Sequence, residues 1–353
     1  MSKLRTIASI GATATLLVTL AGCNPPMPPE VQAAIAEATY TCAATDTTAS
    51  FSPEFSDVAE ELVGSIALNC PEMLVSTGSA DSPVQIGGEL RGDSAPFVDV
   101  PYAVDAGVFA ITSSLGANAI LSPAAIEGIL NGSITNWDDP QIVEDNFGAA
   151  PLEGPITLVS TTSEAALEAL EAWFEHYTSR QLPDALAAKA VVSVDDYAEL
   201  PDGSIAFMPN SVLSQLALTA TMPPMAANLV TDAKNAPEGA MPDFNSIQSG
   251  ASQWKVTKSD GRISVAFDFS KKPVPPLGFD EAPLPYQIVY PLDLRLYGSD
   301  DLGLRAVARY LLRQDSQGSF TAVAGLPVSV RAESLAFVSV GLSVPEPTDI
   351  PQE

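Results

Sequence analysis

The sequence has few of the residues that carry enzyme chemistry and metal binding. Its 353 residues include one histidine, His176, and three cysteines, Cys23, Cys42 and Cys70. Zinc sites are built from close clusters of Cys and His, which this chain does not have. A nucleophile–base pair, a dinucleotide fingerprint, a P-loop and a Gly-x-Ser-x-Gly elbow are also absent from the sequence. We therefore expect no metal, no cofactor and no enzymatic activity, and a surface or packing role for His176.

Positive charge is scarce as well. Lys and Arg number 16 against 43 Asp and Glu, and the formal net charge is −27 at pH 7. Such a surface repels nucleic acid and anionic headgroups, so a DNA or RNA partner is not expected. It also disfavours long-range steering of anionic ligands. A solubility adaptation is the simplest interpretation of the charge.

Long apolar runs are confined to the N-terminus. Lys3 and Arg5 precede an uncharged stretch over residues 6–22, which ends in Leu20-Ala21-Gly22-Cys23. A positive start, a short apolar centre and small residues before the cut are typical of a secretory signal peptide. We predict a signal peptide over residues 1–22, with Cys23 as the lipid-bearing first residue of the mature chain. The alternative is an ordinary signal peptide followed by a chance cysteine.

The segment after Cys23 supports an anchor. Residues 24–29 read NPPMPP, which suits neither a helix nor an inner strand. We interpret residues 23–37 as the lipidated cysteine and an extended tether to the folded body. The predicted location is therefore outside the cytoplasm, at the cell membrane. That environment is oxidising, so Cys42 and Cys70 are expected to form a disulfide.

The remaining chain alternates strands with helices, which indicates an α/β protein. Apolar spacing and capping signals predict helices at residues 53–68, 124–130, 164–177 and 302–313. Strands are predicted at residues 73–76, 98–112, 156–159, 191–194, 204–208 and 287–296, with a hairpin over 253–269. Residues 272–285 are proline-rich and read as a linker or surface excursion. Residues 344–353 are polar and are expected to be a disordered tail.

Three stretches occur in a distinctive order. Residues 121–142 read LSPAAIEGILNGSITNWDDPQI, and residues 203–207 read GSIAF. Tyr290-Pro291 is followed by a predicted helix, Gln317-Gly318 and then Gly325-Leu326-Pro327. Together they resemble the PstS-type phosphate-binding proteins of phosphate ABC importers, which have a type 2 periplasmic-binding-protein-like fold. The resemblance extends over most of residues 42–336.

The resemblance implies two α/β lobes, joined by two crossover strands, with a ligand held in a central cleft. The first lobe would combine residues 38–105 with residues 286–343. The second lobe would be formed by residues 106–285. In such a cleft, helix N-termini and short hydroxyl side chains hold an anion.

The resemblance also implies a binding site built from four loops. These are residues 45–50 before the helix at Pro53, residues 77–80, residues 91–96 and residues 159–164. The aspartate of the third loop is displaced by one position from the family pattern. The ligand contacts carried over are Thr48, Ser50, Ser79, Asp93, Thr161, Thr162 and Ser163.

The fourth loop departs from the family pattern, which is R-x-D-x-S-G-T. This chain reads VSTTSE there, without the arginine that would make a forked contact to phosphate. A hydroxyl-rich helix start remains, which can receive an anion or simply cap the helix. Arg91 could supply a cation from the third loop, or it could be solvated or neutralised by Glu89 and Asp93.

Two functions remain open. The first is a lipid-anchored solute-binding protein that binds phosphate or a related small oxyanion and serves an ABC transporter permease. The second is a divergent lipoprotein with the same fold, which acts as a surface sensor or a structural or adhesion protein without binding phosphate. The altered fourth loop and the acidic composition motivate the second reading.

Overall fold

The computed structural model describes residues 31, 34, 37, 40–88, 95–114, 116, 118–161, 163–183, 200–221 and 223–343. The predicted signal peptide, Cys23, the strand expected at 191–194 and the tail at 344–353 lie outside the described residues, as do Arg91, Asp93 and Thr162. Among the described residues, no helix has the length and apolarity needed to cross a bilayer.

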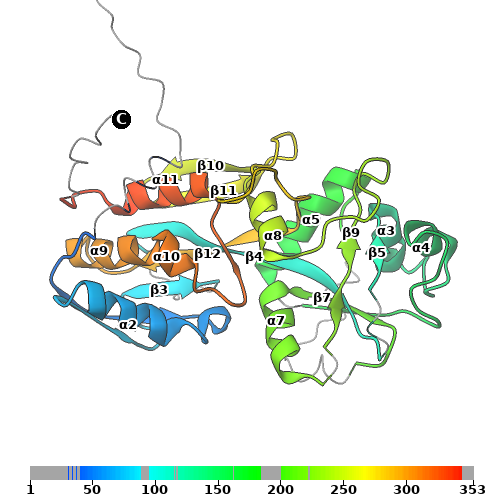
Figure 1. The fold of residues 1–353 in the computed structure, drawn as a ribbon, viewed down its shortest axis with the longest axis horizontal. Helices are drawn as coiled ribbons and strands as arrows, with labels where there is room; N and C mark the ends of the chain where they lie inside the picture. The colour runs from blue at the N-terminus through cyan, green and yellow to red at the C-terminus, as the bar shows by residue number, and fades with distance from the viewer. Residues whose placement is uncertain are drawn as a thin grey trace, which may run out of the picture.

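The first lobe is built on three neighbouring parallel strands. Strand β1 (Thr45–Phe51) lies between β2 (Met73–Thr77) and β3 (Val84–Gly87). The helices of this lobe are α2 (Ala59–Asn69), α9 (Leu302–Leu311), α10 (Gln314–Gln317) and α11 (Val328–Val338). The N-terminal elements up to β3 and the C-terminal elements from α9 onward therefore lie together in one lobe (Figure 1).

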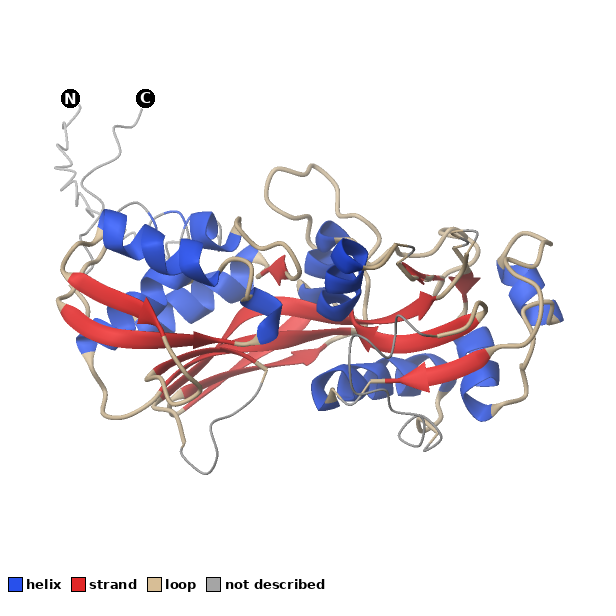
Figure 2. Cartoon of the chain, turned by 90° about the horizontal axis from the view of Figure 1, so that it is seen from below, coloured by secondary structure: helices blue, strands red, loops and turns tan. Residues whose placement is uncertain are grey.

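One long strand runs through both lobes. All 14 residues of β4 (Val98–Ile111) are buried, and its first part pairs with β12 (Val289–Leu296) and β13 (Ala324–Gly325). Its last part pairs with β7 (Ser204–Pro209) and β8 (Met225–Ala226) in the second lobe. The hairpin of β10 (Trp254–Ser259) and β11 (Arg262–Phe267) continues the sheet beside β4. The strands form a continuous layer with helices above and below it (Figure 2).

The second lobe follows the predicted capping signals. Helix α3 (Pro123–Asn131) begins where the Ser122 side chain accepts from the Ala125 N–H, and it ends at Gly132, whose φ is +78°. Helix α5 (Glu164–Thr178) begins in the same way at Ser163. The other elements of this lobe are β5 (Ile120–Leu121), α4 (Pro140–Asp145), β6 (Thr157–Ser160), α7 (Asn210–Thr219), β9 (Asn228–Leu229) and α8 (Phe244–Ala251).

Trp137 connects two of the three stretches that resemble the phosphate-binding family, residues 121–142 and residues 203–207. Its side chain is fully buried, and its Nε1–H donates to the Gly203 carbonyl oxygen at 2.9 Å. Gly203 has a φ of +83° and precedes β7 directly. The tryptophan after α3 is therefore fixed to the start of a strand that follows far later in the sequence.

Two expectations for the N-terminal part are wrong. Residues 45–50 are not a loop but most of β1, because their backbone pairs with strands on both sides. β-Branched threonines suit that extended, half-buried setting. The helix expected over residues 53–68 is split into a short 3₁₀ turn, η1 (Pro53–Phe55), and α2.

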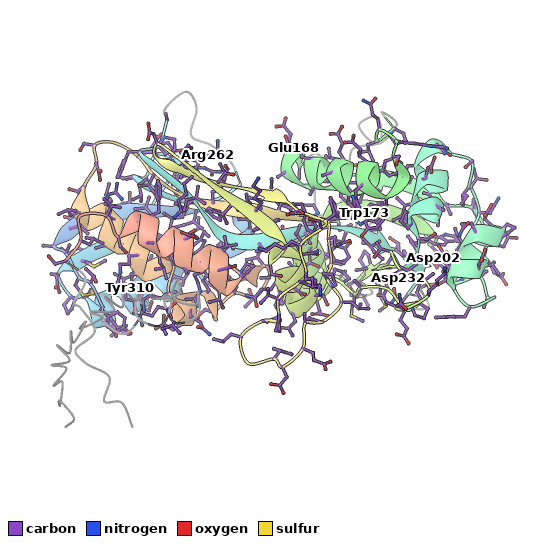
Figure 3. The ribbon with its side chains drawn as sticks, turned by 90° about the horizontal axis from the view of Figure 1, so that it is seen from above. Glu168, Trp173, Asp202, Asp232, Arg262 and Tyr310 are labelled. Carbon is purple, nitrogen blue, oxygen red and sulfur yellow. A yellow bond between two sulfur atoms is a disulfide. The ribbon has the colours of Figure 1, made fainter. Side chains whose placement is uncertain are left out.

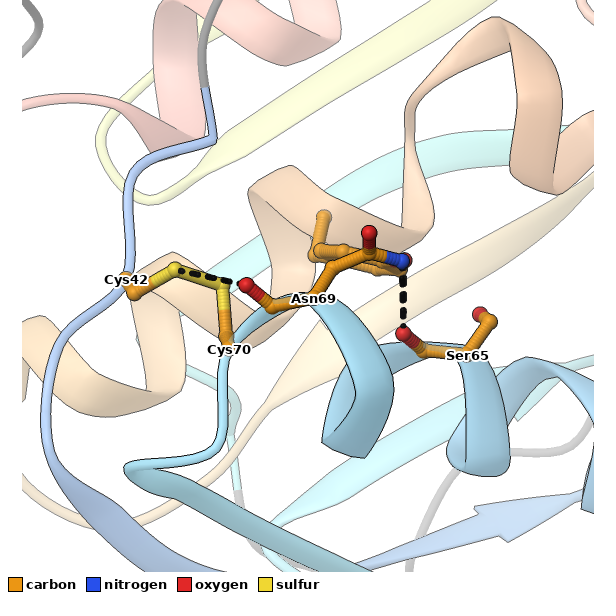
Figure 4. The surroundings of a disulfide bond; sticks show 5 residues. Cys42, Ser65, Asn69 and Cys70 are labelled. Atoms are coloured by element: carbon orange, nitrogen blue, oxygen red, sulfur yellow. Dashed lines mark hydrogen bonds between the residues drawn. A yellow bond between two sulfur atoms is a disulfide. The ribbon is translucent and has the colours of Figure 1, made fainter.

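Cys42 and Cys70 form a disulfide, as expected. It joins the segment before β1 to the end of α2 (Figure 4). Beside it, Asn69 donates to the Ser65 carbonyl oxygen at 2.9 Å and to the Tyr310 hydroxyl at 2.7 Å. The end of α2 is thereby linked both to the N-terminal segment and to α9.

The architecture confirms the predicted class, an α/β protein with two lobes and a type 2 topology. The residue numbers at which we divided the lobes stay a prediction.

Candidate functional site

Asp105 and Tyr290 lie where the crossover strands pass between the lobes. Asp105 belongs to β4 and Tyr290 to β12, and their side chains meet because the Tyr290 hydroxyl donates to Asp105 Oδ2 at 2.9 Å. Both residues are buried. Together they form a buried polar cluster between the lobes, which we call the floor.

Helix starts from the second lobe reach the same floor. At the beginning of α7, the Ser211 N–H donates to Asp105 Oδ1 at 3.2 Å and the Ser211 hydroxyl donates to Asp105 Oδ2 at 2.6 Å. The Ala106 N–H adds a bond to Oδ1 at 2.7 Å. Ser163, which caps α5, lies close enough to the Tyr290 hydroxyl to act on its pKa. The Asp105 carboxylate thus occupies the helix N-terminus of α7, where an anionic ligand could otherwise bind.

The first lobe contributes a second carboxylate. Glu54 of η1 lies close enough for its charge to act on both Asp105 and Tyr290. Its Oε2 is buried and has no hydrogen-bond partner. The floor therefore holds two acidic groups, one of them with an unsatisfied acceptor.

Burial controls the protonation of Asp105. Loss of hydration raises the pKa of its carboxyl to about 6, although the bonds from Ser211, Ala106 and Tyr290 favour the charged form. The charge of Glu54 acts in the same direction as burial. Burial and the Asp105 charge also raise the pKa of Tyr290 well above its ordinary value, so its hydroxyl remains a donor.

A cavity of about 340 Å³ opens beside the floor. The first lobe lines it with Gly88 and β11, and the second lobe lines it with one face of α5, including Ala165 and Glu168. Tyr290 connects the cavity to the floor, because it lines the cavity and contacts Asp105. Figure 3 shows Arg262 on the first lobe and Glu168 on the second, on the same face of the molecule.

The arginines of this cavity already have partners. Arg295 is buried, and its Nη2 lies 3.0 Å from Asp293 while its Nε lies 3.3 Å from Asp99. The Arg262 Nε lies 3.3 Å from the other Asp99 oxygen, but its side chain is 57% exposed. Burial, followed by the nearby charge of Asp99, raises the pKa of Asp293 to about 6. Of these two arginines, Arg262 is the more accessible to a ligand.

The residues predicted from the family pattern fall into two groups. Thr161 and Ser163 lie together at the start of α5, where the Ser163 N–H donates to Thr161 Oγ1 at 3.0 Å. Thr48 lies in β1 against Gly78, and Ser79 follows in the β2–β3 loop. Ser50 also lies in β1, paired with Gln85. No predicted contact that the structure describes lines the 340 Å³ cavity, and the ligand role of all seven stays a prediction.

Sequence reasoning missed Asp105, Glu54, Ser211 and Tyr290 as site residues. A signal for Asp105 was present, because it is an acidic residue inside the otherwise apolar run YAVDAGVFAI. A carboxylate in a buried strand requires several donors, so such a position is a candidate site. The other three residues are recognised only through their contacts.

The fold and the cleft define a two-lobed binding protein of type 2. The profile of the PBP superfamily domain matches residues 74–289, and the chain belongs to that superfamily. No curated protein sequence matches the chain.

Several solved structures have a similar fold. A DING protein is 14% identical with a TM-score of 0.50, over 86% of this chain and 97% of that chain. A human phosphate binding apolipoprotein is 13% identical with a TM-score of 0.50, over 82% of this chain and 94% of that chain. An ABC-type phosphate transport receptor from Vibrio cholerae is 14% identical with a TM-score of 0.43, over 77% of this chain and 96% of that chain. At these identities the similarity shows the fold alone.

Proposed function

We propose that this chain is an extracytoplasmic solute-binding protein that holds phosphate or a related small oxyanion between its lobes. In this proposal Cys23 carries a lipid anchor, and the ligand passes to an ABC transporter permease. The chain binds and releases its ligand without transforming it. The observation that carries the proposal is the polar floor at Asp105 and Tyr290, where β4 and β12 meet the starts of α7 and α5 from the second lobe and Glu54 from the first lobe.

The balance of donors and acceptors supports phosphate over sulfate. The start of α5 offers backbone N–H groups and the hydroxyls of Thr161 and Ser163. Glu54 and Asp105 are acceptors, and the Glu54 Oε2 has no partner. A ligand that donates a hydrogen bond satisfies this site better than one that only accepts. Phosphate carries a proton near neutral pH, whereas sulfate does not.

One observation favours the second candidate, a lipoprotein that binds no oxyanion. The Asp105 carboxylate already accepts from the Ser211 N–H, the Ser211 hydroxyl and the Tyr290 hydroxyl. An internal anion in this position competes with an external one. The two candidates therefore differ in whether the start of α5 binds an anion.

Titration calorimetry on the chain from residue 24 onward tests the proposal. We expect phosphate to bind with sub-millimolar affinity and sulfate to bind at least tenfold more weakly. Ser163→Ala should lower phosphate affinity about tenfold, or about 1.4 kcal/mol, which is near the lower end for one hydrogen bond to a charged group. Ser122→Ala is the matched control, because Ser122 caps α3 with the same geometry, 3.3 Å against 3.4 Å for Ser163.

The outcomes separate the candidates. An equal loss of affinity in both variants would indicate a general effect of helix capping and would contradict the assignment of Ser163. Absence of heat with phosphate and with sulfate, from protein freed of ligand, would favour the lipoprotein that binds no oxyanion.

A further inference from the structure

The proline-rich excursion between β11 and β12 exposes an apolar surface. Val274, Leu277 and Phe279 are 48%, 54% and 48% exposed, and Phe244 at the start of α8 is 41% exposed. We call these four residues the apolar patch. Two adjoining hollows, of about 230 and 450 Å³, lie among these residues. Leu277 and Phe279 line both hollows. Phe244 lines only the smaller hollow, and Val274 lines only the larger one. Exposed apolar surface of this kind marks a contact site.

The body of the protein holds this excursion in place. The Val274 N–H donates to Ser252 Oγ at 2.8 Å, and the Ser249 hydroxyl donates to the Pro283 carbonyl oxygen at 3.0 Å. Near the base of the excursion, Gln253 donates to the Lys271 carbonyl oxygen at 2.6 Å. Prolines fix φ along the excursion and reduce the entropy lost on contact. The apolar side chains are therefore presented outward on a supported segment. Figure 2 shows the excursion rising from the side of the sheet that carries α8.

The folded body begins at the edge of the same patch. Glu37 forms an ion pair with Arg331, and its carboxylate accepts from the Gln314 N–H at 3.2 Å. Arg331 and Gln314 line the smaller hollow together with Phe244 and Leu277. The 14 residues from Cys23 to Ala36 span at most about 50 Å when fully extended. An anchor at Cys23 therefore keeps this face within reach of the membrane.

We propose that the apolar patch docks on the surface of the lipid bilayer and orients the anchored protein. The proposal goes beyond ligand binding and rests on the predicted anchor only for its cellular setting. Within the excursion the exposed Asp280 and Glu281 are balanced by the exposed Lys271 and Lys272, but the chain as a whole carries a net charge of −27. The favoured surface is therefore zwitterionic, because anionic headgroups repel a chain of this net charge. Tethering raises the effective concentration of a weak contact, so a small patch suffices.

Fluorescence with brominated lipids tests this docking. The chain from Cys23 onward is coupled through Cys23 to a maleimide lipid in phosphatidylcholine vesicles, while Cys42 and Cys70 are paired with each other. This coupling supplies the anchor whether or not the cell acylates Cys23. The native Trp137, Trp173 and Trp254 are at most 2% exposed and give a constant background. Phe279→Trp reports on the patch, and Leu218→Trp on α7, where Leu218 is 76% exposed, is the matched control.

We expect bromolipid quenching at least threefold stronger for Phe279→Trp than for Leu218→Trp. Replacing Val274 and Leu277 with Asp in the Phe279→Trp chain should remove this difference, and adding phosphatidylglycerol should reduce it. Equal quenching at both positions overturns the proposal and leaves a protein partner as the occupant. A concentration-dependent blue shift of the Phe279→Trp emission without vesicles also overturns it, because that result indicates a second copy of the chain on the patch.

Discussion

Asp105 joins the two crossover strands and α7 through one carboxylate. It accepts four hydrogen bonds, from the Ala106 N–H, from Ser211 twice and from Tyr290. These donors favour the ionised form, yet burial dominates and raises the pKa of the carboxyl to about 6. The residue therefore links β4, β12 and α7, although burial disfavours its ionised form.

The sign of the resulting pH dependence follows from the raised pKa. The folded state binds the Asp105 proton more tightly than the unfolded state, whose pKa is near 3.8. The stability from this group is fully present below about pH 4 and is lost as the pH rises through about 6. Asp105→Asn keeps an amide in the same network and removes the titration. We expect the decrease in the free energy of unfolding between pH 4 and pH 7.5 to be smaller in the variant, by up to about 3 kcal/mol.

Urea unfolding at several pH values measures this difference. Asp293 has a raised pKa as well, and it contributes equally to the pH dependence of unfolding in the unmodified chain and in Asp105→Asn. Only the difference in pH dependence between these two proteins therefore reports on Asp105. Asp57→Asn, at an exposed position, serves as the control and should follow the unmodified chain. Identical pH profiles for Asp105→Asn and the unmodified chain would contradict a raised pKa at this carboxyl.

At the level of elements, capping residues and apolar spacing predicted helices correctly, but they did not predict strands that form only by pairing with distant segments. Helices α3 and α5 were predictable because Ser122 and Ser163 cap them and their apolar residues recur at helical spacing. Strand β1 was not, because its threonines and serine read as a polar loop, and only pairing with β2 and β3 makes the segment extended. The floor at Asp105 was not found, since it depends on contacts between residues more than 100 positions apart.

The contact between Trp137 and Gly203 joins residues 121–142 to residues 203–207, and its tightness can be tested by substitution. A Cβ at Gly203 would lie 3.1 Å from the Pro155 carbonyl oxygen and 3.3 Å from Trp137 Nε1, on a backbone with a φ of +83°. Gly203→Ala therefore combines a left-handed backbone penalty of about 1–2 kcal/mol with close contact to the indole. We expect it to lower the free energy of unfolding by roughly 2–4 kcal/mol, as measured by urea denaturation.

Gly132→Ala separates the two causes. Gly132 has a φ of +78°, but a Cβ there meets no atom within 4 Å. This variant should lose only the backbone contribution, about 1–2 kcal/mol. If both variants lose the same stability, the contact between Trp137 and Gly203 tolerates a methyl group and the junction is looser than its geometry indicates.

At the scale of the whole molecule, charge opposes the proposed ligand. The net charge is −27, and the cleft pairs Arg262 and Arg295 with Asp99 and Asp293. If the proposed function holds, a phosphate ion approaching this protein meets repulsion at long range and attraction only at short range, at the proposed site at the start of α5. Screening extends over about 30 Å at 0.01 M salt and about 10 Å at 0.1 M, so added salt removes the long-range part first.

The association rate of phosphate should consequently rise with ionic strength, opposite to a binding protein with a cationic cleft. Between 10 and 200 mM sodium chloride we expect an increase of roughly two- to fivefold, measured by stopped-flow fluorescence on a chain that binds phosphate. Dissociation should change little, because the proposed contacts of phosphate with Thr161 and Ser163 lie in a buried or half-buried setting. Repeating the series with sodium gluconate controls for competition by chloride. An association rate that falls with salt would mean that Arg262 makes the local potential positive despite the acidic surface, and it would assign the capture of the anion to that arginine.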